Sequence, residues 1–427
     1  AGRDFPNFRT FFVAHPEYRV CAFTATQIPF IAQRSYPHEL APDSYDSDIP
    51  IYDESELPAL IKTLAIDFVF FSYSDLAHAQ VMHRASIVQA AGASFVLLGP
   101  AQTSLSSRSK VVAVTATRTG TGKSPLTQWL ARSLVDEGVK VVTIRHPMPY
   151  GNLRAQAVQR FASTADLDTQ DCTIEEREEY SPYVSQGLVI FAGVDYEAIV
   201  RAAEAEADLI LWDGGNNDFS FVSADLNIVV CDALRAGHGL DYYPGETNFR
   251  AADIVVINKV GAAAAEDIQT IRSLKDAINP SAGLVTADLD VTVEAPERLR
   301  GKRVLIVEDG PTVTHGGMGY GAGWVAAHKY GVGEVLDPRN SAVGSLLDTF
   351  NAYPQLLAVL PAMGYSQRQR QELKASIEGS GADLVLNASP ADVGRVLELG
   401  LPVVQVKYRF APQSGDDLLA SVRTLLA

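Results

Sequence analysis

The sequence predicts a multi-domain α/β protein whose sheets are largely parallel. Short runs of β-branched and aromatic residues, such as Lys110–Thr115 and Asp208–Trp212, alternate with segments of helical spacing, such as Lys123–Glu137. The runs are apolar on both faces, which is typical of strands that helices cover on both sides. A chain of 427 residues leaves room for about two to four domains.

Further strands and helices follow the same pattern along the chain. We expect helices over His78–Ala91 and Gln367–Ile377, and strands over Asp67–Ser72, Ser94–Leu98, Val139–Arg145, Leu188–Ala192, Asn227–Cys231, Asp253–Asn258, Arg303–Val307, Leu356–Pro361, Asp383–Asn387 and Pro402–Lys407. Polar stretches at Thr103–Ser109 and Ala287–Lys302 suggest two joints. The predicted domains are therefore a Rossmann-like domain (1–108), a central domain (109–290) and a C-terminal segment (291–427) that is either independent or an extension of the central sheet.

Composition excludes some classes of partner. The chain has 35 Lys and Arg against 51 Asp and Glu, a formal charge of −16, so generic binding to nucleic acid or an anionic membrane is not expected. No apolar run approaches the roughly 20 residues of a membrane span, and no signal peptide is recognised. The three cysteines, Cys21, Cys172 and Cys231, form no metal or disulfide pattern, which favours a reducing cytoplasm.

The strongest local motif lies between a predicted strand and a predicted helix. It reads Thr117-Arg-Thr-Gly-Thr-Gly-Lys-Ser124, which matches G-x-x-x-x-G-K-[ST] except that Thr replaces the first Gly. Backbone N–H groups of such a loop cradle phosphates, Lys123 neutralises them and the Ser124 hydroxyl holds Mg²⁺. The alternative is an ordinary turn with a chance Gly-Lys-Ser. The predicted nucleotide ligands are Thr119, Gly120, Thr121, Gly122, Lys123, Ser124 and Pro125.

Arg118 is a second basic residue inside this loop. Its position resembles the signature lysine of K-G-G-x-G-K-[ST], the deviant loop found in the nitrogenase iron protein and dethiobiotin synthetase. That resemblance implies a homodimer, with Arg118 stabilising transition-state charge in its own or the partner subunit. The alternative is an arginine solvated at the loop tip.

A second strand ends in an acidic residue. Ala207–Trp212 runs into Asp213, and then Gly214, Gly215 and Asn216 follow as candidate substrate ligands. This is the Walker B arrangement, in which Asp213 binds Mg²⁺ and the glycines let the backbone approach the γ-phosphate; an Asp that only forms a turn is the alternative. Glu175 or Glu176 is a further candidate for the metal.

Base recognition is predicted at Asn258 and Lys259, which follow a strand and resemble the N-K-x-D motif. Gly261 stands where that motif has the Asp that selects guanine, so adenine is favoured.

The charge of the chain is unevenly distributed. Residues 117–160 hold seven basic and two acidic residues, whereas residues 161–225 hold fifteen acidic and two basic ones. A basic cleft in an acidic shell is expected. Arg145 and His146 follow a strand end and are candidate ligands of a substrate phosphate; a structural pairing of Arg145 is the alternative. His315, a further candidate substrate ligand, opens a loop with five glycines, which is either an anion nest or a closely packed turn.

Eight longer phrases resemble the cyclic 2,3-diphosphoglycerate synthetase family and span nearly the whole chain. Family members carry a strand before G-A-A-G-R-D-F, whereas this chain begins at Ala1-Gly-Arg-Asp-Phe5, so the first strand is expected to be absent. The phrases are Ala22-Phe-Thr-Ala-Thr-Gln-Ile-Pro29, Arg118-Thr-Gly-Thr-Gly-Lys-Ser124, Ile144-Arg-His-Pro-Met-Pro-Tyr-Gly151, Asp171-Cys-Thr-Ile-Glu-Glu-Arg-Glu-Glu-Tyr180, Trp212-Asp-Gly-Gly-Asn-Asn-Asp218, Tyr243-Pro-Gly-Glu-Thr-Asn248, Val307-Glu-Asp-Gly-Pro-Thr-Val-Thr-His-Gly-Gly-Met318 and Pro361-Ala-Met-Gly-Tyr365.

The resemblance implies an enzyme that uses ATP and Mg²⁺ to close 2,3-diphosphoglycerate into a cyclic pyrophosphate with release of ADP and phosphate, or a relative acting on another phosphorylated small molecule. Two other hypotheses stay open. One is a regulatory or chaperone-type P-loop NTPase whose hydrolysis drives a cycle with a protein partner, and the other is a nucleotide-binding module without catalysis.

Overall fold

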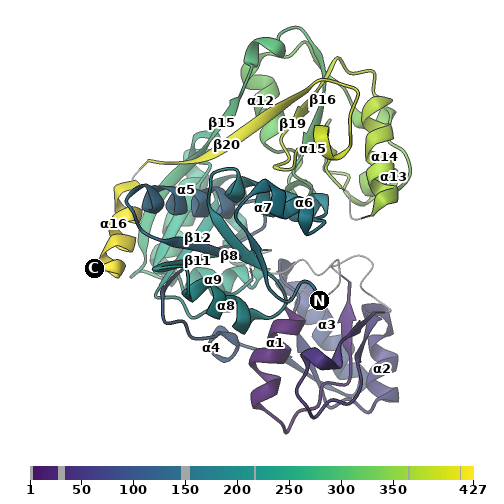
Figure 1. Ribbon diagram of the computed structural model, residues 1–427, viewed down its shortest axis with the longest axis vertical. Helices are drawn as coiled ribbons and strands as arrows, with labels where there is room; N and C mark the ends of the chain where they lie inside the picture. Colours follow the sequence, from purple (N-terminus) through teal and green to yellow (C-terminus); the bar gives the residue numbers. More distant parts are fainter. Residues whose placement is uncertain (1–2, 27–33, 146–153, 216–217, 364–365, 414) are drawn as a thin grey trace.

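The computed structural model describes the chain with a few short gaps. The described residues are 3–26, 34–145, 154–215, 218–363, 366–413 and 415–427. Figure 1 shows the N-terminal segment at the bottom, a central sheet with its helices, and the C-terminal segment at the top. None of the helices in the described part of the chain is long and apolar enough to cross a membrane.

The centre of the molecule is a twisted sheet whose strands are mostly parallel. Its order among the described residues is β15-β14-β12-β7-β11-β8-β10-β9, and only β9 at the edge runs antiparallel to its neighbour. The inner strands are almost entirely buried, as their two-sided apolar pattern predicts, whereas β9 and β15 have partly exposed residues. They are β7 (Lys110–Ala116), β8 (Val141–Arg145), β9 (Gln159–Phe161), β10 (Val189–Ala192), β11 (Leu209–Asp213), β12 (Leu226–Asp232), β14 (Ile254–Asn258) and β15 (Gly283–Val293).

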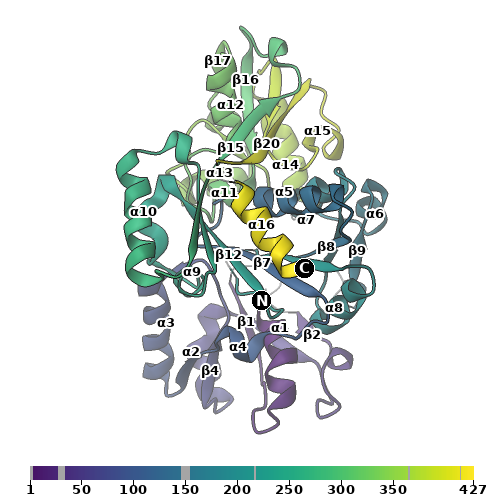
Figure 2. The ribbon, with the colours of Figure 1, turned by 90° about the vertical axis from the view of Figure 1, so that its left-hand side faces the viewer.

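Helices cover both faces of this sheet. Along β7, Val112 and Val114 face one helical layer, while Val111 and Ala113 face the other, because successive side chains alternate. The first layer contains α5 (Lys123–Asp136), α6 (Thr164–Thr169), α7 (Ile174–Val184) and the C-terminal α16 (Gly415–Leu426), which Figure 2 shows lying across the sheet. The second face carries α8 (Tyr196–Glu204), α9 (Gly245–Arg250) and α10 (Ala265–Ile278).

Two long strands join the C-terminal segment to the central sheet. β15 pairs parallel with β14 through its first residues and antiparallel with β20 (Val403–Pro412) through Ala287–Val293. β20 then pairs with β19, so the sheet continues without interruption. The predicted joint therefore begins inside a strand. The remaining elements are β16 (Arg303–Glu308), α11 (Gly310–Val313), α12 (Ala322–Tyr330), β17 (Glu334–Val335), α13 (Ser345–Ala352), β18 (Leu360–Pro361), α14 (Gln367–Glu378), β19 (Leu384–Asn387) and α15 (Val393–Val396).

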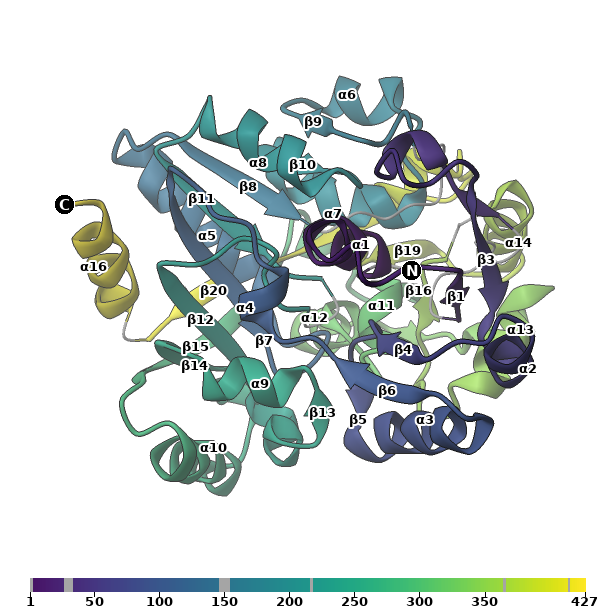
Figure 3. The same ribbon diagram turned by 90° about the horizontal axis from the view of Figure 1, so that it is seen from below.

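The N-terminal segment contains two separate small sheets among the described residues, β1-β3-β2 and β4-β6 (Figure 3). A short pairing between β5 and β13 connects this segment to the central part. The stretch predicted as a linker is packed against the core, since Leu105 bridges to Val222. The elements are α1 (Asp4–Thr10), β1 (Phe23–Ala25), β2 (Ser35–Tyr36), β3 (Ile49–Asp53), α2 (Leu57–Thr63), β4 (Phe68–Phe71), β5 (Leu76–Ala77), α3 (His78–Ala91), β6 (Ser94–Leu97), α4 (Pro100–Thr103) and β13 (Tyr242–Tyr243).

The predicted fold class is confirmed: the chain is a multi-domain α/β protein with a mostly parallel sheet. The helix predicted over His78–Ala91 has those bounds, and the one predicted over Lys123–Glu137 ends one residue earlier. The three-domain division stays a prediction.

Candidate active site

The phosphate loop connects β7 to α5 at the carboxyl edge of the sheet. Gly120 and Gly122 have φ values of +78° and +100°, in the left-handed region that favours glycine. A Cβ at Gly122 would also collide with the Asn258 side-chain amide. Lys123 begins the helix and is 94 % buried. Burial lowers the pKa of Lys123, and the nearby Asp213 opposes this.

Asn258 and Lys259 brace this loop from the end of β14. The Asn258 amide donates a hydrogen bond to the Thr121 carbonyl over 2.7 Å, and Lys259 Nζ donates to the Gly120 carbonyl over 2.7 Å. Lys259 also pairs with Asp232. The structure thus gives both residues a role in holding the loop, while the predicted contact with a base stays a prediction.

A carboxylate lies close to the position of the missing Asp of the N-K-x-D pattern. Asp288 of β15 accepts a hydrogen bond from the Gly261 N–H over 2.9 Å, and its other oxygen accepts from the Leu289 N–H over 2.8 Å. A Cβ at Gly261 would collide with the Asp288 carboxylate. The glycine thus leaves the space that a carboxylate from the neighbouring strand occupies.

Asp213 ends β11, directly beside β7 and β8 in register. It is fully buried. Its Oδ2 accepts a hydrogen bond from the Tyr183 hydroxyl over 2.7 Å and contacts the Arg145 guanidinium, while its Oδ1 has no hydrogen-bond partner among the described residues. Arg145 also donates to Ser124 Oγ over 2.9 Å. An unpartnered buried carboxylate oxygen near a Ser hydroxyl fits the oxygen ligands that Mg²⁺ prefers.

Two further predicted residues follow Asp213. The Gly214 N–H donates to the Val114 carbonyl of β7 over 3.1 Å, and the Gly215 carbonyl accepts from the Asp218 N–H over 2.8 Å, so the backbone of both glycines is hydrogen-bonded within the protein. Asn216 and His146 lie outside the described residues, and their predicted roles stay predictions.

The acidic residues of α7 make different contacts. Glu176 caps its own helix, since it accepts from the Thr173 N–H over 2.8 Å, and it also accepts from the Gln156 amide. Glu175 is 99 % buried. The residue that contacts Arg145 is Glu179, one helical turn after Glu175, which sequence reasoning did not select. Burial raises the pKa of Glu179 to about 7, and Arg145 opposes this.

Arg118 lies in a contact between all three parts of the chain. Its Nε donates to Asp75 over 2.9 Å, its Nη1 lies 3.0 Å from His238 Nδ1, and its Nη2 reaches the carbonyls of His315 and Gly316. The guanidinium stacks 3.6 Å from the Tyr242 ring centroid. The structure places His315 in this contact through its backbone. The predicted roles of Arg118 at a phosphate and His315 at a substrate are untested.

The glycine loop that follows His315 forms an anion nest, which a carboxylate of the protein itself occupies. The Glu308 carboxylate accepts from the N–H groups of Gly321, Gly323 and Trp324 over 2.8 to 3.1 Å. A Cβ at Gly321 would lie 2.5 Å from Glu308 Oε2. Both expectations for the loop, a nest and close packing, therefore describe the same contact with a side chain of the protein.

A cavity of about 1320 Å³ lies between the phosphate loop and the C-terminal segment. Lys123 and Ser124 belong to one wall, and β16 and β20 contribute to the other. Eight basic and seven acidic residues line it, so its charge is mixed, whereas the sequence led us to expect a basic cleft. Its walls include Glu178, Glu179, Asp309 and Tyr408.

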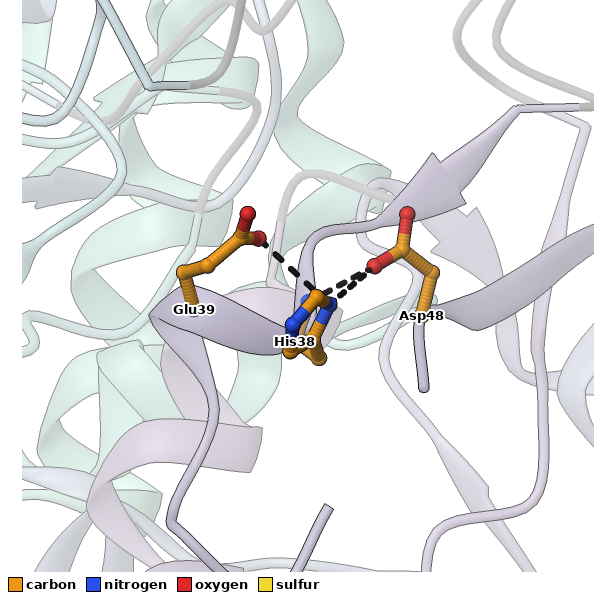
Figure 4. Close-up of side chains that lie close together, drawn as sticks. All are labelled: His38, Glu39 and Asp48. Carbon is orange, nitrogen blue, oxygen red and sulfur yellow. Dashed lines mark hydrogen bonds and ion pairs between the residues drawn. The ribbon is translucent and has the colours of Figure 1, made fainter. Parts of the chain in front are cut away.

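One group of His, Glu and Asp side chains in the described residues has ligand atoms within 4.8 Å of one another, at His38, Glu39 and Asp48. Figure 4 shows His38 between the two carboxylates. All three are exposed. The His38 ring lies 2.7 Å from Asp48, and Glu39 pairs with Arg154, so ion pairing accounts for the arrangement.

The strand, loop and helix around Lys123 define a P-loop protein. No family model matches the chain. Arginine synthetase ArcE of Thermococcus kodakarensis is 56 % identical over 408 residues, which cover 96 % of this chain and 91 % of that protein. The chain belongs to the family of arginine synthetase ArcE, and it is an enzyme of the synthetase class.

Other similarities are more distant. Cyclic 2,3-diphosphoglycerate synthetase of Thermococcus sibiricus is 28 % identical over 130 residues, 29 % of each chain, so the predicted family is supported only in part. The ATP complex of LpxK from Aquifex aeolicus matches with a TM-score of 0.45 and 11 % identity over 76 % of this chain and 90 % of that one. HypB of Archaeoglobus fulgidus matches with a TM-score of 0.27 and 17 % identity over 42 % and 81 %.

Proposed function

We propose that the protein is an ATP- and Mg²⁺-dependent synthetase that forms arginine. The observation that carries the proposal is the cavity in which the P-loop residues Lys123 and Ser124 share walls with Glu178 and Asp309. Such a cavity holds anionic phosphates on one side and a cationic group on the other. The 56 % identity with an arginine synthetase supports the choice of product.

The chain supplies the groups that phosphoryl chemistry requires. The backbone of Gly120 and Gly122 and the Lys123 ammonium would bind the nucleotide phosphates. Ser124 and Asp213 would hold Mg²⁺, which neutralises charge on the transferred phosphoryl group. Tyr183 fixes one Asp213 oxygen and leaves the other available. Since phosphoryl transfer depends on positioning and charge, these contacts account for the first half of a synthetase reaction.

Cyclisation of 2,3-diphosphoglycerate is the second candidate, and the 28 % identity over 130 residues favours it. A doubly phosphorylated substrate needs several unpaired cations. In this structure the Arg145 guanidinium is paired with Asp213 and Glu179, and Arg118 is paired with Asp75. The choice of arginine formation over cyclisation rests on the 56 % identity with an arginine synthetase over 96 % of this chain.

The reverse reaction, in which consumption of arginine would drive formation of ATP from ADP and phosphate, tests the proposal. The protein is incubated with arginine, ADP, Mg²⁺ and radioactive phosphate, while glucose and hexokinase trap any ATP. We expect labelled glucose 6-phosphate that depends on arginine and is lost in Lys123→Ala. Absence of arginine-dependent label, together with hydrolysis of ATP that no small molecule stimulates, would instead support the regulatory NTPase. A cyclic product from 2,3-diphosphoglycerate, followed by ³¹P resonance, would support the second candidate.

Cytoplasmic location and a homodimer remain part of the proposal, on the basis of the cysteine pattern and the Arg118-type loop. Light scattering with an ATP analogue present tests the dimer, and a monomer would contradict it.

A further inference from the structure

Two carboxylates in the cavity come from different parts of the chain. Glu178 belongs to α7 of the central part, and Asp309 follows β16 in the C-terminal segment. Both line the cavity that also contains Lys123. Glu178 is 96 % buried. Its Oε1 accepts a hydrogen bond from Ser389 Oγ over 2.5 Å, but its Oε2 has no hydrogen-bond partner among the described residues.

Neither carboxylate has a basic partner of its own. Within the part of the chain that the structure describes, no Lys, Arg or His forms an ion pair with Glu178 or Asp309, whereas Glu179 contacts Arg145. Asp309 accepts from the N–H and hydroxyl of Thr312 through one oxygen. A buried carboxylate is costly unless a cation or hydrogen-bond donors compensate it. The neighbouring Glu308 shows the contrast, because three backbone N–H groups satisfy it.

The lining of the cavity indicates which kind of cation fits. Met318, Tyr320, Val406 and Tyr408 give the cavity apolar and aromatic surface. A guanidinium is flat, weakly hydrated and has five N–H donors that match carboxylates in pairs. Mg²⁺ instead retains water and near-octahedral oxygen ligands, and the residues that suit it are Ser124 of the P-loop and the buried Asp213.

We propose that Glu178 and Asp309 bind the guanidinium end of arginine, and the corresponding end of its precursor, facing the P-loop. This inference rests on the proposed function, since it names the substrate group that the same site receives. The two residues come from the central part and the C-terminal segment, so a ligand held between them would also connect these parts across the cavity.

Binding measurements test this separately from catalysis. Calorimetry with Mg·ADP present would use arginine and agmatine, which keeps the guanidinium but lacks the carboxylate. We expect Glu178→Gln and Asp309→Asn to weaken both ligands at least tenfold and to leave ADP affinity unchanged. The matched control is Glu294→Gln, which removes a charge from an exposed carboxylate of the same cavity that pairs with Lys407. If Glu178→Gln fails to fold, the subsite is tested with Asp309→Asn alone, because Asp309 is less buried.

The outcomes separate the two proposals. Binding of agmatine that depends on Glu178 or Asp309, without arginine-dependent ATP formation, would keep the subsite and reject the function. Arginine-dependent ATP formation with unchanged binding in both variants would keep the function and reject the subsite. Failure of the wild type to bind either guanidinium compound overturns the subsite, and so does a loss of one Mn²⁺ per chain in Glu178→Gln, because it would identify a metal site.

Discussion

The guanidinium of Arg145 donates a hydrogen bond to Ser124 Oγ over 2.9 Å and, from the same nitrogen, contacts Asp213. Ser124 and Asp213 are the two residues that fit Mg²⁺. In this structure the arginine therefore lies between the two metal ligands and compensates the charge of a fully buried carboxylate.

We expect Arg145→Ala to lower the free energy of unfolding by about 3 kcal/mol, because it removes the cation that pairs with the buried Asp213. Added Mg²⁺ should then raise the thermal midpoint of the variant more than that of the wild type, since the ion takes over the charge. Thermal unfolding with and without Mg²⁺ measures both effects. Arg132→Ala is the control, because Arg132 pairs with Asp136 on the exposed side of α5. If Mg²⁺ raises the thermal midpoint of the wild type and of the variant equally, Arg145 and Mg²⁺ do not compensate the same carboxylate.

Lys123→Ala should reduce ATP turnover at least 100-fold, because a preorganised cation beside the phosphates stabilises charge in the transition state. Among the described residues the Lys123 ammonium has no ion pair, so its removal leaves no buried group without a partner and the loss should not extend to the fold. Steady-state rates measure the loss of turnover, and a circular dichroism spectrum shows whether the fold is kept. Lys110→Ala, at the exposed start of β7, is the control. Turnover close to the wild-type value would remove Lys123 from the active site.

Nucleotide preference follows from the contacts of Asp288. Both of its oxygens accept backbone N–H groups, from Gly261 and Leu289. We therefore expect ATP to bind more tightly than GTP. We also expect Asp288→Asn to change the ratio of the two dissociation constants by no more than about twofold. Asn258→Ala, which removes the brace on Thr121, should weaken both nucleotides about tenfold, the equivalent of one hydrogen bond. Competition against a fluorescent nucleotide measures the six dissociation constants, of ATP and GTP for the wild type and the two variants. A selective loss of GTP binding in Asp288→Asn would mean that Asp288 reads the base.

The sequence predicted those parts of the site that depend on neighbours along the chain. The P-loop glycines, Lys123 and Asp213 are placed by a strand, a turn and a helix, and such local patterns are visible in the sequence. Glu179 and Asp288 were missed because their partners come from other elements. A signal existed for Glu179, since it lies one helical turn after Glu175 on the same acidic run.

The same distinction applies to the fold. Alternating apolar strands and helices predicted the parallel sheet. The continuation into the C-terminal segment depends on β15, where Leu289 and Val291 alternate with Asp288 and Asp290. This period of two is typical of a strand with one face exposed, but the acidic residues suggested a joint. Only the pairing with β20 shows that the strand runs on.

A carboxylate far from the active site connects two helices of the C-terminal segment. Glu372 on α14 accepts from the N–H and hydroxyl of Ser345, at the first residue of α13, over 3.0 and 2.6 Å, and Arg368 donates to its other oxygen. The hydrogen bonds from Ser345 lower the pKa of Glu372 to about 2.

Because this pKa is lower in the folded state than in the unfolded one, the ionised carboxylate stabilises the fold above about pH 4.5, and the contribution is lost as the pH falls toward 2. Glu372→Gln should therefore cost about 1 kcal/mol at neutral pH, the value of a helix cap, and much less near pH 2.5. Denaturant unfolding of both proteins at the two pH values measures the difference. Arg368→Ala is the control and should cost less than 0.5 kcal/mol, roughly the value of an exposed pair. A cost for Glu372→Gln that does not change with pH would show that the shape of the side chain, and not its charge, holds α13 to α14.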